Sequence, residues 1–164
     1  MSVDAAALRR SPMPPGARIG IDLVRVERIA RSVADFGERF TTRLFAPGEL
    51  RAATVGGRLD AGALATRFVA KEAAIKAFDL AEAGVGWAQI EVAEAGGRDA
   101  RPGEGRVRLH GRAAQAASSS TPGWPYEIAV AMTEDDGMAC AIVVALPSHP
   151  AAEGEEALGR GAPC

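Results

Sequence analysis

The sequence is short of the residues that hold metal clusters and disulfides together. It has two cysteines and two histidines in 164 residues. Cys140 lies within an apolar run and Cys164 is the last residue, so we expect neither a structural disulfide nor a zinc cluster. His149 falls in a segment rich in Pro, Gly and Ala, where we expect no catalytic role.

Long apolar runs and an excess of one charge are also missing. No stretch approaches the roughly 20 apolar residues that cross a bilayer, and the N-terminal segment lacks the apolar core of a signal peptide. The formal net charge is −2, from 19 Lys and Arg against 21 Asp and Glu. Nothing in this balance favours nucleic acid or a membrane as a partner. We therefore expect a reduced, cytoplasmic protein.

The two ends differ in composition from the middle. Residues 1–17 are rich in Ala, Pro and Arg, and residues 147–164 in Gly, Pro, Ala and Glu. Neither segment could bury enough apolar surface to offset its ordering entropy. We predict a flexible N-terminal extension (1–17), one folded domain (18–146) and a flexible C-terminal tail (147–164).

Hydrophobic periodicity predicts the elements of this domain. A strand (18–24) precedes a helix that runs from Val26 to about residue 37. Further helices are expected from Pro47 to before Gly56, and from Asp60 to about Phe78. Strands follow around residues 90–92, 107–109, 127–132 and 138–146. The first two are joined by a turn-rich connection (96–105), and a short helix (112–119) and a loop (118–125) come before the third. TEDDG (133–137) is a hairpin signal between the last two strands. Helices followed by strands indicate an α+β fold with an antiparallel sheet.

Two carboxylates lie where charges are unusual. Asp22 interrupts an apolar strand, where Asp is depleted, and Glu72 lies in the apolar helix segment RFVAKEAAIKAF (67–78) with Lys76 four residues on. Two carboxylates in one partly apolar site repel each other unless a cation joins them, and Mg²⁺ prefers such oxygen ligands. Plainer explanations are a helix-stabilising Glu72–Lys76 pair and an Asp22 that ends a strand or caps a helix.

Two motifs support the first interpretation. GIDLVRVERI (20–29) and RFVAKEAAIKAF (67–78) resemble the strand–helix start and the motif helix of the holo-acyl-carrier-protein synthase family, the small 4′-phosphopantetheinyl transferases. FTTRLFAPGEL (40–50) and VGWAQIEV (85–92) resemble further segments of that family, and the resemblance covers roughly residues 18–146. It implies a 4′-phosphopantetheinyl transferase-like fold, with an antiparallel sheet packed against a long motif-bearing helix.

The resemblance implies a reaction and a set of residues for it. The 4′-phosphopantetheine arm of coenzyme A would move to a serine of apo-acyl carrier protein, with release of adenosine 3′,5′-bisphosphate. Asp22 and Glu72 would hold Mg²⁺, and Lys76 would neutralise phosphate charge. Glu72, directly or through a metal-bound water, is also the best candidate to take the serine proton. Arg67 and Lys71 are further candidate contacts for coenzyme A, although either could be a solvated residue at a helix edge.

The resemblance also implies partners. Arg28 matches the arginine of the family's first motif, and Arg25 lies one turn before it. Because carrier proteins are acidic, both arginines are candidate partner contacts. Members of the family are characteristically homotrimers with active sites at the subunit interfaces, and the apolar run MACAIVVAL (138–146) is consistent with a strand that is covered on both faces.

One departure leaves alternatives open. Many relatives carry Ser-x-Ser-His on the penultimate strand, and this sequence has Ala129-Val130-Ala131-Met132 there. A degenerate homologue that binds coenzyme A or a carrier protein without transfer is therefore one alternative. Another is a domain dedicated to one fatty-acid or polyketide synthase, with the terminal segments as docking or linker regions. The intact set of Asp22, Glu72 and Lys76 favours an active enzyme.

Overall fold

The computed structural model describes residues 16–94, 103–119 and 125–148. Its elements in chain order are β1 (Arg18–Arg25), α2 (Val26–Phe36), α3 (Glu38–Leu44), α4 (Pro47–Ala52), β2 (Thr54–Val55), β3 (Arg58–Leu59), α5 (Ala61–Phe78), the 3₁₀ turn η1 (Trp87–Gln89), β4 (Ile90–Glu94), β5 (Glu104–Leu109), α6 (Gly111–Ser119), β6 (Tyr126–Asp135) and β7 (Met138–Pro147).

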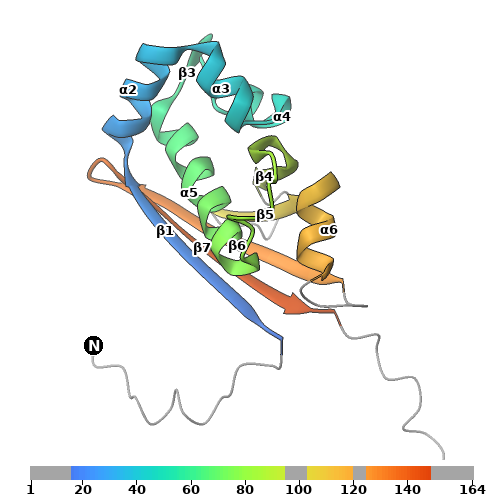
Figure 1. Ribbon diagram of the computed structural model, residues 1–164. Coiled ribbons are helices and arrows are strands. Elements are labelled where there is room, and N and C mark those ends of the chain that lie inside the picture. The colour runs from blue at the N-terminus through green and yellow to red at the C-terminus, as the bar shows by residue number, and fades with distance from the viewer. Residues whose placement is uncertain (1–15, 95–102, 120–124, 149–164) are drawn as a thin grey trace, which may run out of the picture.

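An antiparallel sheet and one long helix form the body of the fold. The strands are ordered β1-β7-β6-β5-β4, so the first strand of the chain pairs with the last. Helix α5 lies across one face of this sheet, with α2, α3 and α4 beyond one end and α6 beside the other (Figure 1). The predicted α+β architecture is confirmed.

The core is the contact of α5 with β1 and β7. In the middle of α5, the residues turned to the sheet are small, and Ala70, Ala73 and Ala74 are completely buried. Small side chains let the helix lie close to the strands. Asp60 caps α5, since its Oδ1 accepts a hydrogen bond from Ala63 N at 2.6 Å, and the helix ends at Asp79 in the left-handed region (φ 54°). Both ends agree with the prediction.

The structure differs from the expected elements at three points. Helix α3 and the small β2–β3 hairpin were not predicted. Helix α3 is short, follows Gly37 directly and contains two β-branched threonines that weaken the helical signal, and β2 and β3 have only two residues each. The strands around TEDDG run further than expected, since Thr133–Asp135 still belong to β6 and only Asp136 and Gly137 turn. Both turn residues have positive φ (47° and 70°), as a type I′ hairpin requires.

Several expectations fall outside the described residues. The N-terminal extension as far as residue 15, the tail from residue 149 with Cys164, and most of the 96–105 and 118–125 connections are among them. In the described part, Cys140 is a free thiol in β7. No described helix is long and apolar enough to cross a bilayer. The expected cytoplasmic location stays a prediction.

Candidate active site

Strand β1 presents its two faces to different surroundings. Gly20, Asp22 and Val24 face α5, whereas Ile19, Ile21 and Leu23 on the alternate positions are more than half exposed. Asp22 lies opposite Ala141 of β7, and its side chain is 17% exposed. The strand therefore aims a carboxylate at the helix that carries Glu72.

Lys76 joins this strand to α5. Its Nζ donates to Asp22 Oδ1 at 2.6 Å and to the Ile21 carbonyl at 3.2 Å. The hydrogen bond to Asp22 raises the pKa of Lys76, so the ammonium is retained at neutral pH. The ion pair found for Lys76 is thus with Asp22 on β1, whereas the plainer explanation placed it with Glu72 on the same helix.

Glu72 completes a cluster of charges between β1, α2 and α5. Burial raises its pKa above the usual value for a glutamate, and the neighbouring Asp22 carboxylate raises it further. Lys76 and Arg28 oppose this shift with their positive charges. Asp22, Lys76 and Arg28 therefore all lie close enough to Glu72 to act on its charge, although the four residues come from three elements.

The donor set of this cluster suits a hard cation. Asp22 and Glu72 offer carboxylate oxygens, and their repulsion is the kind that a divalent ion relieves. Among the described residues, no group of three or more His, Cys, Asp or Glu comes together. Mg²⁺ commonly takes only one or two protein carboxylates and completes its octahedron with water and phosphate oxygens. Two carboxylates beside a lysine therefore fit Mg²⁺ rather than zinc.

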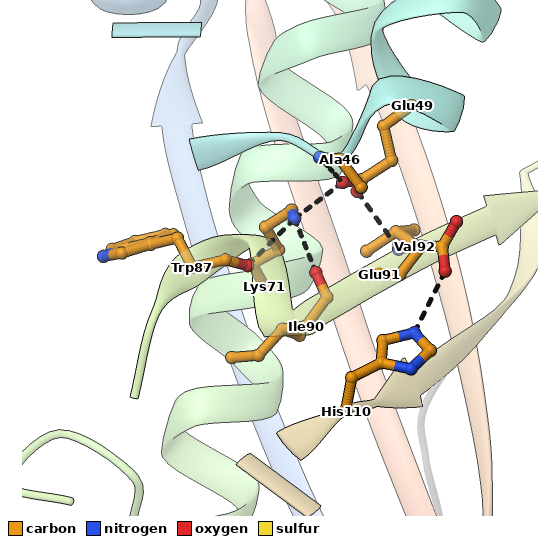
Figure 2. A network of polar contacts seen from close by, with 8 residues as sticks. All are labelled: Ala46, Glu49, Lys71, Trp87, Ile90, Glu91, Val92 and His110. Carbon is orange, nitrogen blue, oxygen red and sulfur yellow. Dashed lines mark hydrogen bonds and ion pairs between the residues drawn. The ribbon is translucent and has the colours of Figure 1, made fainter. Parts of the chain in front are cut away.

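Lys71 is buried inside the protein and not at a substrate-binding surface as the sequence analysis had expected. It was expected to contact coenzyme A, but it is 0% exposed. Its Nζ pairs with Glu49 Oε2 at 2.7 Å and donates to the carbonyls of Trp87 and Ile90 (Figure 2). Burial lowers its pKa and Glu49 opposes that shift. All three of its N–H donors are used, so Lys71 is a structural cation without access to a ligand.

Arg67 is also mostly buried. Its guanidinium pairs with the exposed Glu94 at 2.8 Å and donates to the Ala63 carbonyl, and the side chain is 4% exposed. Its Nε is buried without a hydrogen-bond partner. Arg67 could therefore take a phosphate only by exchanging Glu94 for it.

Glu49 is a residue of this region to which the sequence analysis gave no role. It accepts hydrogen bonds from Ala46 N at 2.7 Å and from Val92 N at 3.1 Å, in addition to its pair with Lys71. One signal was present, because a glutamate at the third position of a helix commonly bonds back to the residue before the helix. Its long-range partners on α5 and β4 could not be read from the local pattern.

Of the candidate partner arginines, Arg28 lies on α2, beside the charge cluster, and Arg25 is the last residue of β1, directly before that helix. Arg25 and Arg28 border a shallow hollow together with Arg31. Arg31 is engaged by Glu27 at 2.6 Å. Arg28 lies close enough to Glu72 to act on its pKa. Arg28 thus contributes its positive charge to the cluster.

The position of the missing histidine is defined by the strand register. Met132 on β6 lies opposite Ala141 of β7, which in turn lies opposite Asp22 of β1. The residue that replaces the histidine of many relatives is therefore in the same row of the sheet as Asp22.

Comparison with known proteins agrees with the motifs. The family model described as the 4′-phosphopantetheinyl transferase superfamily matches residues 18–131. A holo-[acyl-carrier-protein] synthase of Methylobacterium sp. (strain 4-46) is 41% identical over 77% of this chain and 90% of its own length, and that of Paramagnetospirillum magneticum is 39% identical over 77% and 92%. The structure of a Chronobacterium ammoniagenes acyl-carrier-protein synthase–coenzyme A complex aligns with a TM-score of 0.66 and 27% identity, covering 82% of this chain and 99% of the other.

Proposed function

The chain belongs to the 4′-phosphopantetheinyl transferase superfamily, and from this membership we propose that it moves the 4′-phosphopantetheine arm of coenzyme A to a serine of apo-acyl carrier protein. The second product is adenosine 3′,5′-bisphosphate. Several relatives carry the name holo-[acyl-carrier-protein] synthase, and one related structure is a coenzyme A complex. These names support the substrate pair.

The meeting of Asp22, Glu72 and Lys76 is the observation that carries the proposal. They come from β1 and α5, which are joined by the 2.6 Å contact between Lys76 and Asp22. A fold without this chemistry has no need of a carboxylate in an apolar strand beside a second carboxylate whose pKa burial raises. The cluster supports an active enzyme over a binding protein that has lost catalysis.

The proposed residue roles follow from the charges. Asp22 and Glu72 would hold Mg²⁺, which supplies a Lewis acid for the pyrophosphate when it is bound. Lys76, half exposed, would neutralise phosphate charge. Glu72 is also the candidate to accept the serine proton. Transfer of this kind depends mainly on positioning and charge neutralisation.

We propose fewer residues as substrate contacts than the sequence suggested. Lys76 is the proposed phosphate contact for coenzyme A. Arg67 is kept as a second phosphate contact, provided that the phosphate displaces Glu94 from its guanidinium. The Nε of Arg67, which is buried without a hydrogen-bond partner, supports that exchange. Lys71 is not retained, because it is 0% exposed. For the acidic carrier protein we keep Arg28 on α2 and Arg25 at the end of β1.

The open face of the sheet supports the proposed homotrimer. Large apolar side chains are exposed on β1 and on its neighbour β7, on the side away from α5; they are Ile19, Ile21, Leu23, Ile142 and Leu146. An apolar patch that spans adjacent strands is a common sign of a protein interface. We propose that copies of this chain cover it, and that each site lies near such an interface.

Intact mass spectrometry tests the proposed reaction. Apo-acyl carrier protein is incubated with coenzyme A, Mg²⁺ and the protein, and a gain of one phosphopantetheine is expected. Asp22→Asn, Glu72→Gln and a chelator should each reduce the rate by about 100-fold or more. Glu82→Gln, at an exposed carboxylate outside the cluster, is the matched control and should be as fast as the wild type.

The same experiment decides between transfer and binding alone. Coenzyme A binding without any mass gain, with several carrier proteins, would favour a degenerate homologue. The replacement of the expected Ser-His by Ala131 and Met132 motivates that alternative. A mass gain that survives the chelator and the Asp22 and Glu72 variants would instead keep the reaction and refute its metal site.

A further inference from the structure

The Glu49–Lys71 ion pair is a buried feature that the proposed chemistry leaves unused. Lys71 Nζ and Glu49 Oε2 are 2.7 Å apart, and the two side chains are 0% and 1% exposed. Desolvating two charges is costly, and a hydrophobic pair of the same volume is often at least as stable. A gain in stability is therefore not enough to explain why this fold contains a buried ion pair, and we looked for another role for it.

The pair ties together segments that are distant in the sequence. Lys71 on α5 also donates to the carbonyls of Trp87 and Ile90, on η1 and at the start of β4. Glu49 on α4 also accepts from the backbone N–H groups of Ala46 and Val92. Figure 2 shows these contacts converging between α4, α5 and β4. Each charged group thus bonds its partner and two backbone groups, and no apolar pair could replace these four additional bonds.

In the middle turns of α5, packing on the sheet does little to fix the rotation of the helix, so its directed polar contacts matter most; those of Lys71 stand beside the Arg67–Glu94 and Lys76–Asp22 pairs. The buried side chains there are mainly alanines, namely Ala70, Ala73, Ala74 and Ala77. Alanine projects only a methyl group, so it interdigitates weakly with a facing strand. The directed hydrogen bonds of Lys71, in contrast, hold one rotation and one depth of α5.

That rotation sets the position of Glu72, the next residue of the helix. Successive residues of a helix point about 100° apart. With Lys71 fixed toward α4 and β4, Glu72 is held on the neighbouring flank, where Asp22 and Arg28 act on its pKa. A small turn of α5 would move the Glu72 carboxylate away from Asp22.

We propose that Glu49 and Lys71 are positioning residues, whose buried ion pair holds α5 in the rotation that places Glu72 beside Asp22. This inference rests on the proposed role of Glu72. Neither residue touches a substrate, and both act through the backbone of α5.

The test compares Glu49→Gln, Lys71→Met and the double variant with Val107→Ala. Val107 is buried in β5 and serves as a control for loss of stability in the core. Turnover is measured at a temperature where each protein is fully folded by circular dichroism. Both single variants should have a kcat about 10–100-fold lower than the wild type, and a KM for the carrier protein within about twofold of it. Losses of this size are typical when a residue that orients a metal ligand is removed. Val107→Ala should lower Tm but keep kcat.

The double variant separates positioning from stability. Removal of the second charge ends the burial of an unpaired ion, so the double variant should regain Tm relative to Lys71→Met. Its kcat should stay low, because neither residue then fixes the helix. Recovery of kcat together with Tm would overturn the proposal, as would a folded Glu49→Gln with wild-type kcat. Glu49→Gln is nearly isosteric, so the test stands even if Lys71→Met fails to fold.

A binding measurement gives a second readout that does not use turnover. Mn²⁺ is titrated into each protein and followed by electron paramagnetic resonance. The pair variants should bind Mn²⁺ about 10-fold or more weakly, and Val107→Ala should bind it like the wild type. Unchanged Mn²⁺ affinity in folded pair variants would overturn the inference. An inactive wild type would instead refute the proposed function, and the two failures are thus distinguishable.

Discussion

Gly20 of β1 lies directly against the backbone of α5 at Ala73. A Cβ built on Gly20 would be 1.8 Å from the carbonyl oxygen of Ala73, far inside contact distance. Strand and helix therefore meet without an intervening side chain. Asp22 follows two residues later on the same face of β1, so this close approach brings its carboxylate within 2.6 Å of Lys76 Nζ. The glycine of the GID motif thus sets the distance across the candidate site.

Replacement of Gly20 by alanine should damage both fold and activity. The atoms in the way belong to the backbone of α5 and cannot rotate aside, so β1 and the helix must separate. We expect a loss of about 1–3 kcal/mol in the free energy of unfolding and a fall in kcat in the surviving folded protein. Gly48→Ala is the control, since its Cβ would meet only side-chain ends at 3.4 Å or more. Equal Tm values for Gly20→Ala and the wild type would contradict this account.

Lys76→Met should reduce activity far more than stability. Lys76 is 52% exposed, and an ion pair at such a site contributes only about 0–1 kcal/mol. If Lys76 neutralises phosphate charge, its loss should lower kcat/KM by about 100–1000-fold. Lys76→Arg keeps the charge and should retain more activity than Lys76→Met. Chemical denaturation and steady-state kinetics of both variants are the measurements, and nearly normal kinetics for Lys76→Met would remove the residue from the mechanism.

The raised pKa of Glu72 predicts a stability change with a definite sign. The folded protein holds the Glu72 proton more tightly than the unfolded chain does, so the stability contributed by protonated Glu72 is full at low pH and is lost as pH rises through the folded pKa. In chelator, Glu72→Gln should therefore have a higher Tm than the wild type at pH 8. The difference should vanish near pH 4. Differential scanning calorimetry of both proteins at both pH values measures this difference. A lower Tm for Glu72→Gln than for the wild type at pH 8 would contradict the raised pKa of Glu72.

The sequence predicts the parts of the site that are local. Asp22 and Glu72 stand out because each is a charge within an apolar pattern, and Asp60 is recognisable as a helix cap. Both predictions need only residues that are neighbours in one element. The architecture of strand, helices and strands follows from the same periodicities.

Long-range partners account for what the sequence could not predict. Lys71 has the spacing of a solvated helix-edge residue, but its ion pair is with Glu49, which is 22 residues away. Lys76 has the spacing of a helix pair with Glu72, and its ion pair is with Asp22, 54 residues away. The i,i+4 rule describes an isolated helix, whereas here the packing of β1, α4 and β4 against α5 selects the partner.

The exposed apolar face of the sheet should be necessary for self-association. Ile21 is 53% exposed on β1, and Ile21→Glu would bury a charge in any interface that covers this face. We expect the wild type to have the mass of a trimer by light scattering, and Ile21→Glu to be monomeric and nearly inactive. Val55→Glu, at a more exposed apolar residue on β2, should stay trimeric. A monomeric and fully active wild type would refute the interface.

Loss of Arg28 should affect the carrier protein more than coenzyme A. Arg28 lies on α2 at the border of the charge cluster, where an acidic carrier protein would have to approach Glu72 to deliver its serine. Arg28→Gln should raise KM for the carrier protein by about 10-fold at low salt and leave KM for coenzyme A within about twofold, and the difference should shrink as ionic strength screens the attraction. Arg58→Gln on β3 removes the same charge elsewhere and should have no such effect. If KM for coenzyme A rises instead, Arg28 belongs to the nucleotide side of the site, and the orientation proposed for the two substrates must be exchanged.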